Sequence, residues 1–315
     1  MNNLKKVGLT ALAGALVSVS ANAADLSVTG GVSLNFSGEE KQTTGNGWSM
    51  NDGITFKASG ELDNGFAVTV TQIIDSSDGT ANTIMDTRIL AIDMGDSGTL
   101  TFSGTGGSSV LAAIDDVTPT AGEESWDDVT GADTIPGGTG GDNMFHYSNS
   151  SLMDGVTVSA SYTPSNGTTE VESSTDYGIK YTGVDGLTVG LAAGTDETAP
   201  TATIDISNMY VTYAMDAFTV GYQATESDSE TANSDKDFTA IGLSYAVSEE
   251  MSVSINTSTV DYESATLSDQ EATGISVSYV MGSMTLKANH NSVDNIAGAA
   301  TDDRSGYALG LTFAF

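Results

Sequence analysis

The sequence predicts an all-β protein: a 16-stranded antiparallel transmembrane β-barrel whose long third loop folds into the lumen. Three observations support this fold class. Short segments alternate apolar and polar residues along almost the whole chain, and the connections between them alternate between short and long. One connection, residues 105–142, is far longer than the rest. Structureless loops longer than about 12–15 residues are uncommon unless they are functional or disordered.

The first 23 residues have the features of a secretory signal. Lys5 and Lys6 form a basic start, residues 7–19 are apolar or small, and residues 21–23 (Ala-Asn-Ala) form a small-residue cleavage site. The apolar run is shorter than the roughly 20 residues that a transmembrane helix needs. We therefore expect a signal peptide at 1–23 and one barrel domain at 24–315.

The mature chain is strongly acidic. The formal charge of the whole chain is −33; without Lys5 and Lys6, seven bases remain against 42 acids, which gives −35. Such a chain repels nucleic acid and attracts small cations. Cysteine is absent, so stability must come from burial and hydrogen bonds rather than from disulfides.

The strands are predicted from alternation with a period of two. In residues 25–36 and again in 52–62, apolar residues occupy every second position. Residues 63–65 (Asp-Asn-Gly) then form a tight hairpin turn, because Asn-Gly supplies the positive φ that such a turn requires. The sixteen expected strands are 25–36, 52–62, 65–74, 86–94, 98–104, 143–149, 155–163, 175–182, 186–195, 205–214, 217–226, 236–247, 250–260, 271–281, 283–291 and 304–315.

The connections between these strands form two classes that alternate strictly. Outer-membrane barrels have short periplasmic turns, long external loops and an even number of strands, whereas a soluble sandwich has no need to place every long loop at one end. Sixteen strands also enclose an aqueous channel, while about eight leave an interior filled by side chains. The short connections are 63–64, 95–97, 150–154, 183–185, 215–216, 248–249 and 282, and the long ones are 37–51, 75–85, 105–142, 164–174, 196–204, 227–235, 261–270 and 292–303.

Aromatic residues gather next to the short connections. Each lies on the apolar face of its strand, as one girdle at the membrane interface should. The opposite faces contain mainly Ser, Thr, Asn and Gly, which suits the lining of a water-filled lumen. The girdle residues are Phe66, Tyr181, Tyr213, Phe218, Tyr245, Tyr279, Phe313 and Phe315.

The last segment alternates apolar residues and ends on Phe315. A terminal amphipathic strand that closes on phenylalanine resembles the assembly signal of outer-membrane barrel proteins, which assigns that role to Phe313 and Phe315. The whole mature chain, with residues 51–56 and 60–66 as its second hairpin, resembles general porins of the alphaproteobacterial type. The resemblance implies a homotrimer in the outer membrane of a Gram-negative bacterium, in contact with lipid and lipopolysaccharide, with the third long loop inside the barrel.

The resemblance also implies a constriction at which loop carboxylates face bases on the wall. Lys57, Lys180 and Lys287 have the parity of lumen-facing positions, and Arg304 has the same parity near the external rim. The cluster of wall arginines that is usual in the family is missing. Loop 105–142 contains no Lys or Arg, and its acids are Asp115, Asp116, Glu123, Glu124, Asp127, Asp128, Asp133 and Asp142.

The balance of charges at this constriction favours cations. Two unit charges about 4 Å apart interact by roughly 4 kcal/mol at an effective dielectric constant near 20. Eight carboxylates against three or four bases therefore predict a negative constriction, and rings of Asp and Glu are a common device in cation channels. The alternative for each acid is a solvated surface charge.

Three acidic pairs in the loop could also hold Ca²⁺, which takes six to eight oxygen ligands. No EF-hand or nonapeptide spacing accompanies them, so the sequence requires no cofactor and leaves calcium as an open alternative. The pairs are Asp115 and Asp116, Glu123 and Glu124, and Asp127 and Asp128.

The favoured function is passive diffusion of small hydrophilic solutes and ions, with cations preferred. A solute-specific channel of the same fold, with Trp126 or Tyr210 in an aromatic track, is one alternative. A secreted acidic β-rich surface protein or adhesin is another. We do not expect an enzyme, because His146 and His290 lie in no metal-ligand pattern and the chain has no nucleophile elbow or Walker loop.

Overall fold

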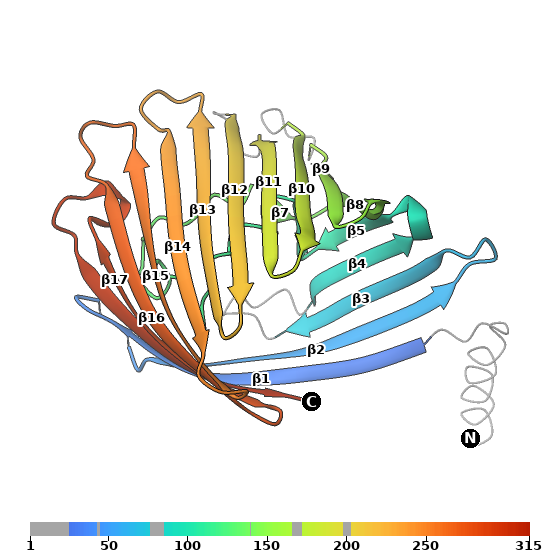
Figure 1. The fold of residues 1–315 in the computed structure, drawn as a ribbon, viewed down its shortest axis with the longest axis horizontal. Helices are drawn as coiled ribbons and strands as arrows, with labels where there is room; N and C mark the ends of the chain where they lie inside the picture. Colours follow the sequence, from blue (N-terminus) through green and yellow to red (C-terminus); the bar gives the residue numbers. More distant parts are fainter. Residues whose placement is uncertain (1–24, 43–44, 76–84, 139, 166–171, 198–202) are drawn as a thin grey trace, which may run out of the picture.

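A computed structural model describes residues 25–42, 45–75, 85–138, 140–165, 172–197 and 203–315. The predicted signal peptide lies outside these residues, so that prediction stays open. Within the described residues, sixteen antiparallel strands close into one barrel (Figure 1). Closure is made by β1 (Asp25–Glu39) and β18 (Arg304–Ala314), which pair from Gly31 opposite Ala314 to Glu39 opposite Gly306. The predicted fold class is confirmed.

All sixteen expected strands are present, and their ends lie within about four residues of the predicted ones, which is the usual uncertainty of sequence-based boundaries. In the part of the chain that the structure describes, no helix is long and apolar enough to span a membrane. Between β1 and β18, the barrel strands are β2 (Trp48–Glu61), β3 (Ala67–Asp75), β4 (Met85–Asp93), β5 (Thr99–Thr105), β8 (Met144–Met153), β9 (Val156–Thr163), β10 (Ser174–Val184), β11 (Leu187–Asp196), β12 (Ile204–Met215), β13 (Phe218–Ser229), β14 (Lys236–Ala246), β15 (Met251–Tyr262), β16 (Gln270–Met281) and β17 (Met284–Asp294).

The third long connection has little regular structure. It runs from the end of β5 to the start of β8, and these two strands pair directly, so the wall stays closed beneath it. Two-residue strands β6 (Gly107–Ser108) and β7 (Gly140–Gly141) pair with each other at the neck of the loop. Short 3₁₀ turns at η1 (Gly95–Ser97) and η2 (Ile296–Gly298) complete the described elements.

The alternation of the sequence separates the wall into an apolar outer face and a largely polar inner face. Leu243, Ile255 and Ile275 are cross-strand neighbours on the outer face, and their side chains are 40–54% exposed. Asn256, next in sequence to Ile255, points to the opposite face and is buried there. A continuous apolar outer surface suits contact with hydrocarbon.

Aromatic side chains mark the end of the barrel that carries the short turns. The rings of Phe218 and Tyr245 lie 4.6 Å apart across β13 and β14. Phe66, which precedes β3, is less exposed than the other members of the predicted girdle. The exposed members are Tyr181, Tyr213, Phe218, Tyr245, Tyr279, Phe313 and Phe315.

The seam between β1 and β18 includes the last residue. The Phe315 N–H donates to the Gly30 carbonyl at 2.9 Å, and the Gly30 N–H donates to the Phe315 carbonyl at 2.7 Å. The Phe315 ring lies over Gly30, where a Cβ atom would come within 3.0 Å of it. The terminal phenylalanine therefore adds both ladder bonds and a ring contact to the seam.

Deletion of Phe315 should lower the yield of folded barrel. The loss of two backbone hydrogen bonds alone predicts about 1–3 kcal/mol less stability. The measurement is the fraction of refolded protein that keeps a heat-modifiable gel mobility. Phe315→Tyr, which keeps the backbone bonds and the ring, is the matched control and should refold normally. Equal yields for the deletion and the control would show that the seam does not need this residue.

Candidate functional site

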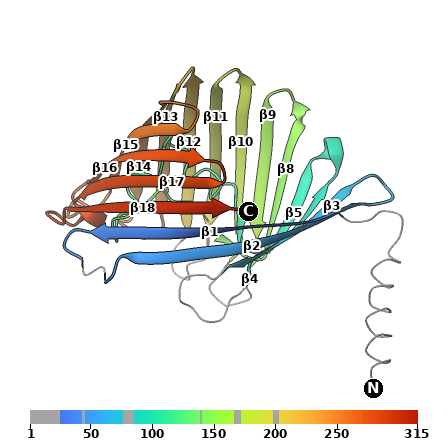
Figure 2. The ribbon, with the colours of Figure 1, turned by 90° about the horizontal axis from the view of Figure 1, so that it is seen from below.

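The long third loop lies against the inner face of the barrel wall (Figures 1 and 2). Near its start, the Val110 N–H donates to Ser161 Oγ at 2.9 Å. Gln223 Nε2 on β13 then donates to the Ile114 carbonyl at 2.7 Å. Ser161 and Gln223 are buried by this contact. The loop therefore crosses from β9 to β13 while inner-face side chains satisfy its backbone groups.

The middle of the loop is held in the same way by β15 and β17. The Ala121 N–H donates to Ser254 Oγ at 2.8 Å. Asn291 Nδ2 donates to the carbonyl oxygens of Glu124 and Asp127, both at 2.7 Å. Backbone groups removed from water need such partners, and here wall amides and hydroxyls provide them.

Apolar contacts fix the loop to the wall at three points. Trp126 meets Phe238 edge to face, with ring centroids 5.0 Å apart, and Ile135 belongs to the same cluster. Val110 and Leu111 pack near the start of the loop, and Val129 packs near its far end. Trp126 is only 4% exposed, because its ring is covered by the loop and the wall, and the alternative of an aromatic solute track stays a prediction.

Wall glycines allow the loop backbone to lie close to the strands. A Cβ atom at Gly242 on β14 would come within 2.5 Å of the Thr118 side chain. At Gly306 on β18, a Cβ atom would overlap the Asp128 carbonyl. Any larger residue at these two inner-face positions would push the loop into the lumen.

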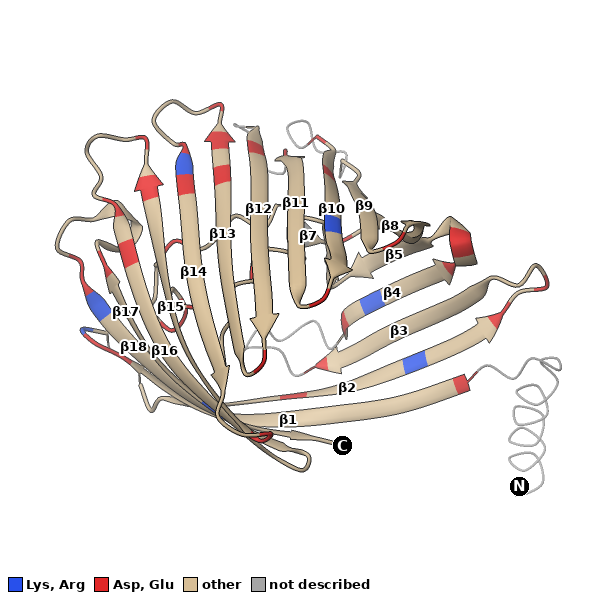
Figure 3. Ribbon diagram, viewed as in Figure 1, with Lys and Arg blue, Asp and Glu red and all other residues tan. Residues whose placement is uncertain are grey.

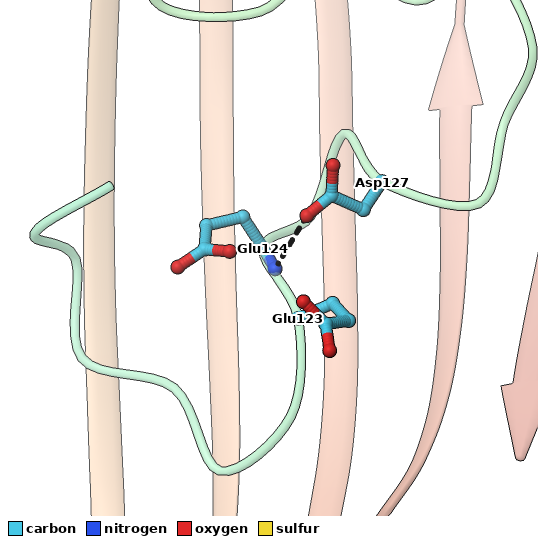
Figure 4. Close-up of side chains that lie close together, drawn as sticks. All are labelled: Glu123, Glu124 and Asp127. Carbon is cyan, nitrogen blue, oxygen red and sulfur yellow. Dashed lines mark hydrogen bonds between the residues drawn. The ribbon is translucent and has the colours of Figure 1, made fainter. Parts of the chain in front are cut away.

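Six of the eight predicted acids interact with one another at the middle of the loop. The carboxylate oxygens of Glu123, Glu124 and Asp127 lie within 4.8 Å of one another (Figure 4). The Asp127 carboxylate also accepts a hydrogen bond from the Glu124 backbone N–H at 3.2 Å. We call the whole set the acidic group, and its members are Asp115, Asp116, Glu123, Glu124, Asp127 and Asp128.

Burial and mutual repulsion favour the neutral forms of five of these six carboxyl groups, those of Asp115, Asp116, Glu124, Asp127 and Asp128. Burial, with repulsion from Asp116 and Asp127, raises the pKa of Glu124 to about 8. Burial also raises the pKa of Asp127 and of Asp115 to about 6. Burial is also the main cause that raises the pKa values of Asp116 and Asp128. At neutral pH the acidic group therefore has less than its formal charge, which corrects the simple count of eight carboxylates.

Asp133 lies apart from the acidic group and anchors the loop to β14, β15 and β16. Its carboxylate is 2.9 Å from Lys236 Nζ and accepts a bond from the Tyr262 hydroxyl at 2.7 Å. Gln270 bonds both the backbone N–H and the carbonyl of Asp133, at 2.9 and 3.0 Å. Asp142 is also separate: it accepts a bond from the Gly106 N–H at 3.3 Å and closes the loop neck.

The predicted wall bases have different surroundings. Lys287 faces the acidic group, with its Nζ 3.6 Å from Glu123 and 3.3 Å from the Gly122 carbonyl. Arg304 is buried and paired with Glu39 and Asp302, so it belongs to a rim ion pair rather than to an open wall. Lys57 and Lys180 are exposed and have no ion pair with any described residue. Figure 3 shows how few bases the strands contain, and how the acids gather towards the strand ends and loops.

Lys236 is a functional base that the sequence analysis missed. Its strand parity matches Phe238 and Ala240, two apolar residues, so side-chain alternation alone would have placed it on the lipid face. Those two residues in fact face inward and pack against the loop. The available signal was that apolar residues occupy both faces of β14.

A closed 16-stranded wall with an apolar outer face and a loop held inside defines a transmembrane β-barrel channel. Residues 8–268 match the family model of Gram-negative porins, so the chain belongs to the Gram-negative porin family and forms an outer-membrane porin channel. A search among curated protein sequences found no match.

Solved structures support the same fold. The anion-selective porin from Comamonas acidovorans has a TM-score of 0.75 and 14% identity, with 93% of this chain and 100% of that one covered. A trimer form of OmpT from Vibrio cholerae has a TM-score of 0.67 and 11% identity, covering 93% and 99%. A mutant of Rh. blastica porin has a TM-score of 0.64 and 16% identity, covering 92% and 100%.

The anchor at Asp133 should limit the fluctuations of the open-channel current. Asp133→Asn removes the charge that holds Lys236, and charge-assisted hydrogen bonds contribute about 1.5–3 kcal/mol each. We expect larger open-channel current fluctuations in single-channel recordings because the loop is held less firmly. Asp142→Asn at the loop neck is the matched control and should leave the noise close to wild type. An Asp133→Asn channel as quiet as wild type would contradict the anchoring role.

Proposed function

We propose that this porin lets small hydrophilic solutes and ions diffuse passively and prefers cations. The observation that supports the preference most is the acidic group, which has Lys287 as its single ion-pair partner among the described residues. The similar Comamonas acidovorans porin is anion-selective, but a likeness at 14% identity concerns the fold alone. The selectivity proposed here therefore rests on the charges of this chain.

The cation preference should increase with pH. A carboxyl group is neutral below its pKa and negative above it, and the raised pKa values lie at about 6 for Asp115 and Asp127 and about 8 for Glu124. Raising the pH from 5 to 9 therefore adds negative charge to the lumen. Fixed negative charge in a low-dielectric constriction attracts cations and repels anions.

The test is the reversal potential of purified protein in a planar bilayer under a tenfold KCl gradient. We expect a potential on the potassium side of zero at pH 7, with a shift towards the potassium Nernst value at pH 9 and towards zero at pH 5. Glu124→Gln should flatten the part of this shift above pH 7, because it removes the group with the highest pKa. A reversal potential shifted towards the chloride Nernst value at every pH would refute the cation preference. A folded protein that conducts no current would refute the channel function.

Calcium bound by the loop is a second part of the proposal. Glu123, Glu124 and Asp127 offer three oxygens within 4.8 Å of one another, which suits a hard cation that prefers carboxylate ligands. Of the pairs named from the sequence, Asp115, Asp116 and Asp128 lie outside this closest set. Bound Ca²⁺ would offset the repulsion that raises the pKa of Glu124.

Calcium should therefore reduce the cation selectivity and the fluctuations of the open-channel current. Adding millimolar Ca²⁺ to a chelated wild-type channel should move the reversal potential towards zero, and Glu123→Gln should weaken this response at least several-fold. Mg²⁺ at the same concentration controls for screening by a divalent ion, because its smaller, strictly octahedral shell fits such a cluster less well. An identical response to Ca²⁺ and Mg²⁺ in both proteins would argue for screening alone.

The proposed channel works as a homotrimer surrounded by outer-membrane lipid and lipopolysaccharide. Two observations support that arrangement: the similar OmpT from Vibrio cholerae has been solved in a trimer form, and the outer face of this barrel is apolar and exposed. The proposal includes no catalytic activity, because the family to which the chain belongs is one of porins.

A further inference from the structure

A cavity of about 190 Å³ lies between the first part of the loop and the inner face of β8 to β12. The loop contributes an apolar side to it, formed by Val110, Ala113 and Ile114. The wall contributes polar side chains, among them those of Lys180, His146 and Tyr210. The cavity is separate from the acidic group, none of whose carboxylates lines it.

Two wall positions bring polar groups together at this cavity. Lys180, Gly190 and Tyr210 form one cross-strand row on β10, β11 and β12. The far end of the Tyr210 ring lies across Gly190, where a Cβ atom would come within 2.0–2.5 Å of the ring. Since Gly190 separates the two side chains, this placement directs the Tyr210 hydroxyl towards the strand that carries Lys180.

The donors around the cavity have no protein acceptor. The Lys180 ammonium, the His146 ring and the Tyr210 hydroxyl form no hydrogen bond or ion pair with any described residue. The nearby carboxylate on β10, Asp176, is 1% exposed; its Oδ2 accepts bonds from the Leu111 N–H and the Ser161 hydroxyl, and its buried Oδ1 has no hydrogen-bond partner among the described residues. A cation and two neutral donors beside an apolar wall form a site that favours a small organic anion.

We propose that this cavity binds a small monocarboxylate with a short apolar chain. The carboxylate pairs with Lys180 and accepts bonds from Tyr210 and His146, while its chain packs against Val110 and Ile114. A volume of 190 Å³ corresponds to roughly six water molecules at about 30 Å³ each, which limits the solute to a few carbon atoms. This inference rests on the proposed channel function and names a class of solute that the channel would hold transiently.

The site has a mechanistic consequence for a channel with a net negative lumen. Anions enter such a lumen poorly, because fixed carboxylates repel them. A local cluster of donors lowers that barrier at one place for carboxylates that also fit the apolar side. Saturation at low solute concentration would then distinguish monocarboxylates from ions that cross by diffusion alone.

The experiment measures block of the KCl current of a single channel by sodium butyrate. We expect saturable block of the wild-type channel by butyrate and at least tenfold weaker block by the neutral isostere butyramide. Lys180→Gln should raise the half-blocking butyrate concentration at least tenfold, and Tyr210→Phe should raise it a few-fold. Lys57→Gln removes the same charge from the inner face of β2, outside this cavity, and butyrate should block this variant as it blocks the wild type.

Each result decides between the site and its alternatives. Equal block of wild type and Lys180→Gln, equal loss of block in Lys57→Gln, or block by butyramide as strong as by butyrate would overturn the site. The KCl current before butyrate is added is a separate readout: normal current without butyrate block removes the cavity site and leaves the channel. A folded protein with no current removes the proposed function instead.

Discussion

Docking of the third loop against the inner wall is the constraint on which the rest of this molecule depends. The backbone groups on the side of the loop that packs against the wall lose contact with water and must find partners in the wall. Here Gln223 and Asn291 donate to loop carbonyls, and Ser254 accepts from a loop N–H. These wall positions look like ordinary small or polar lumen residues, yet each is buried by the loop.

Docking also creates the electrostatics of the lumen. It brings six carboxyl groups together and buries five of them enough to favour their protonated forms. The pKa of Glu124 rises to about 8 in the docked loop from an ordinary value of 4.5. Proton uptake by Glu124 and docking of the loop therefore favour each other. The contribution of Glu124 to the stability of the docked state is complete below pH 4.5 and is lost as the pH rises through about 8.

The strands could be predicted from the sequence because their pattern is local. Alternation, the Asn64-Gly65 turn and the two classes of connection located all sixteen, and the odd length of residues 105–142 identified the loop. The path of the loop could not be predicted, since its partners are 50 or more residues away in the chain. The assumption that apolar residues face lipid failed at Phe238, which packs on Trp126 inside, and this error concealed Lys236.

The same docking decides which bases remain available to solutes. Lys236 is held by Asp133, Lys287 lies beside Glu123, and Arg304 is paired at the rim. Lys57 and Lys180 are left without an ion pair among the described residues. A count of lumen charges treats all five bases alike, but a base paired with a carboxylate contributes less to the field that a passing ion meets. The selectivity proposed for this porin therefore depends on the contacts of the loop rather than on composition: the loop presents the carboxylates of the acidic group and leaves Lys57 and Lys180 without an ion pair among the described residues.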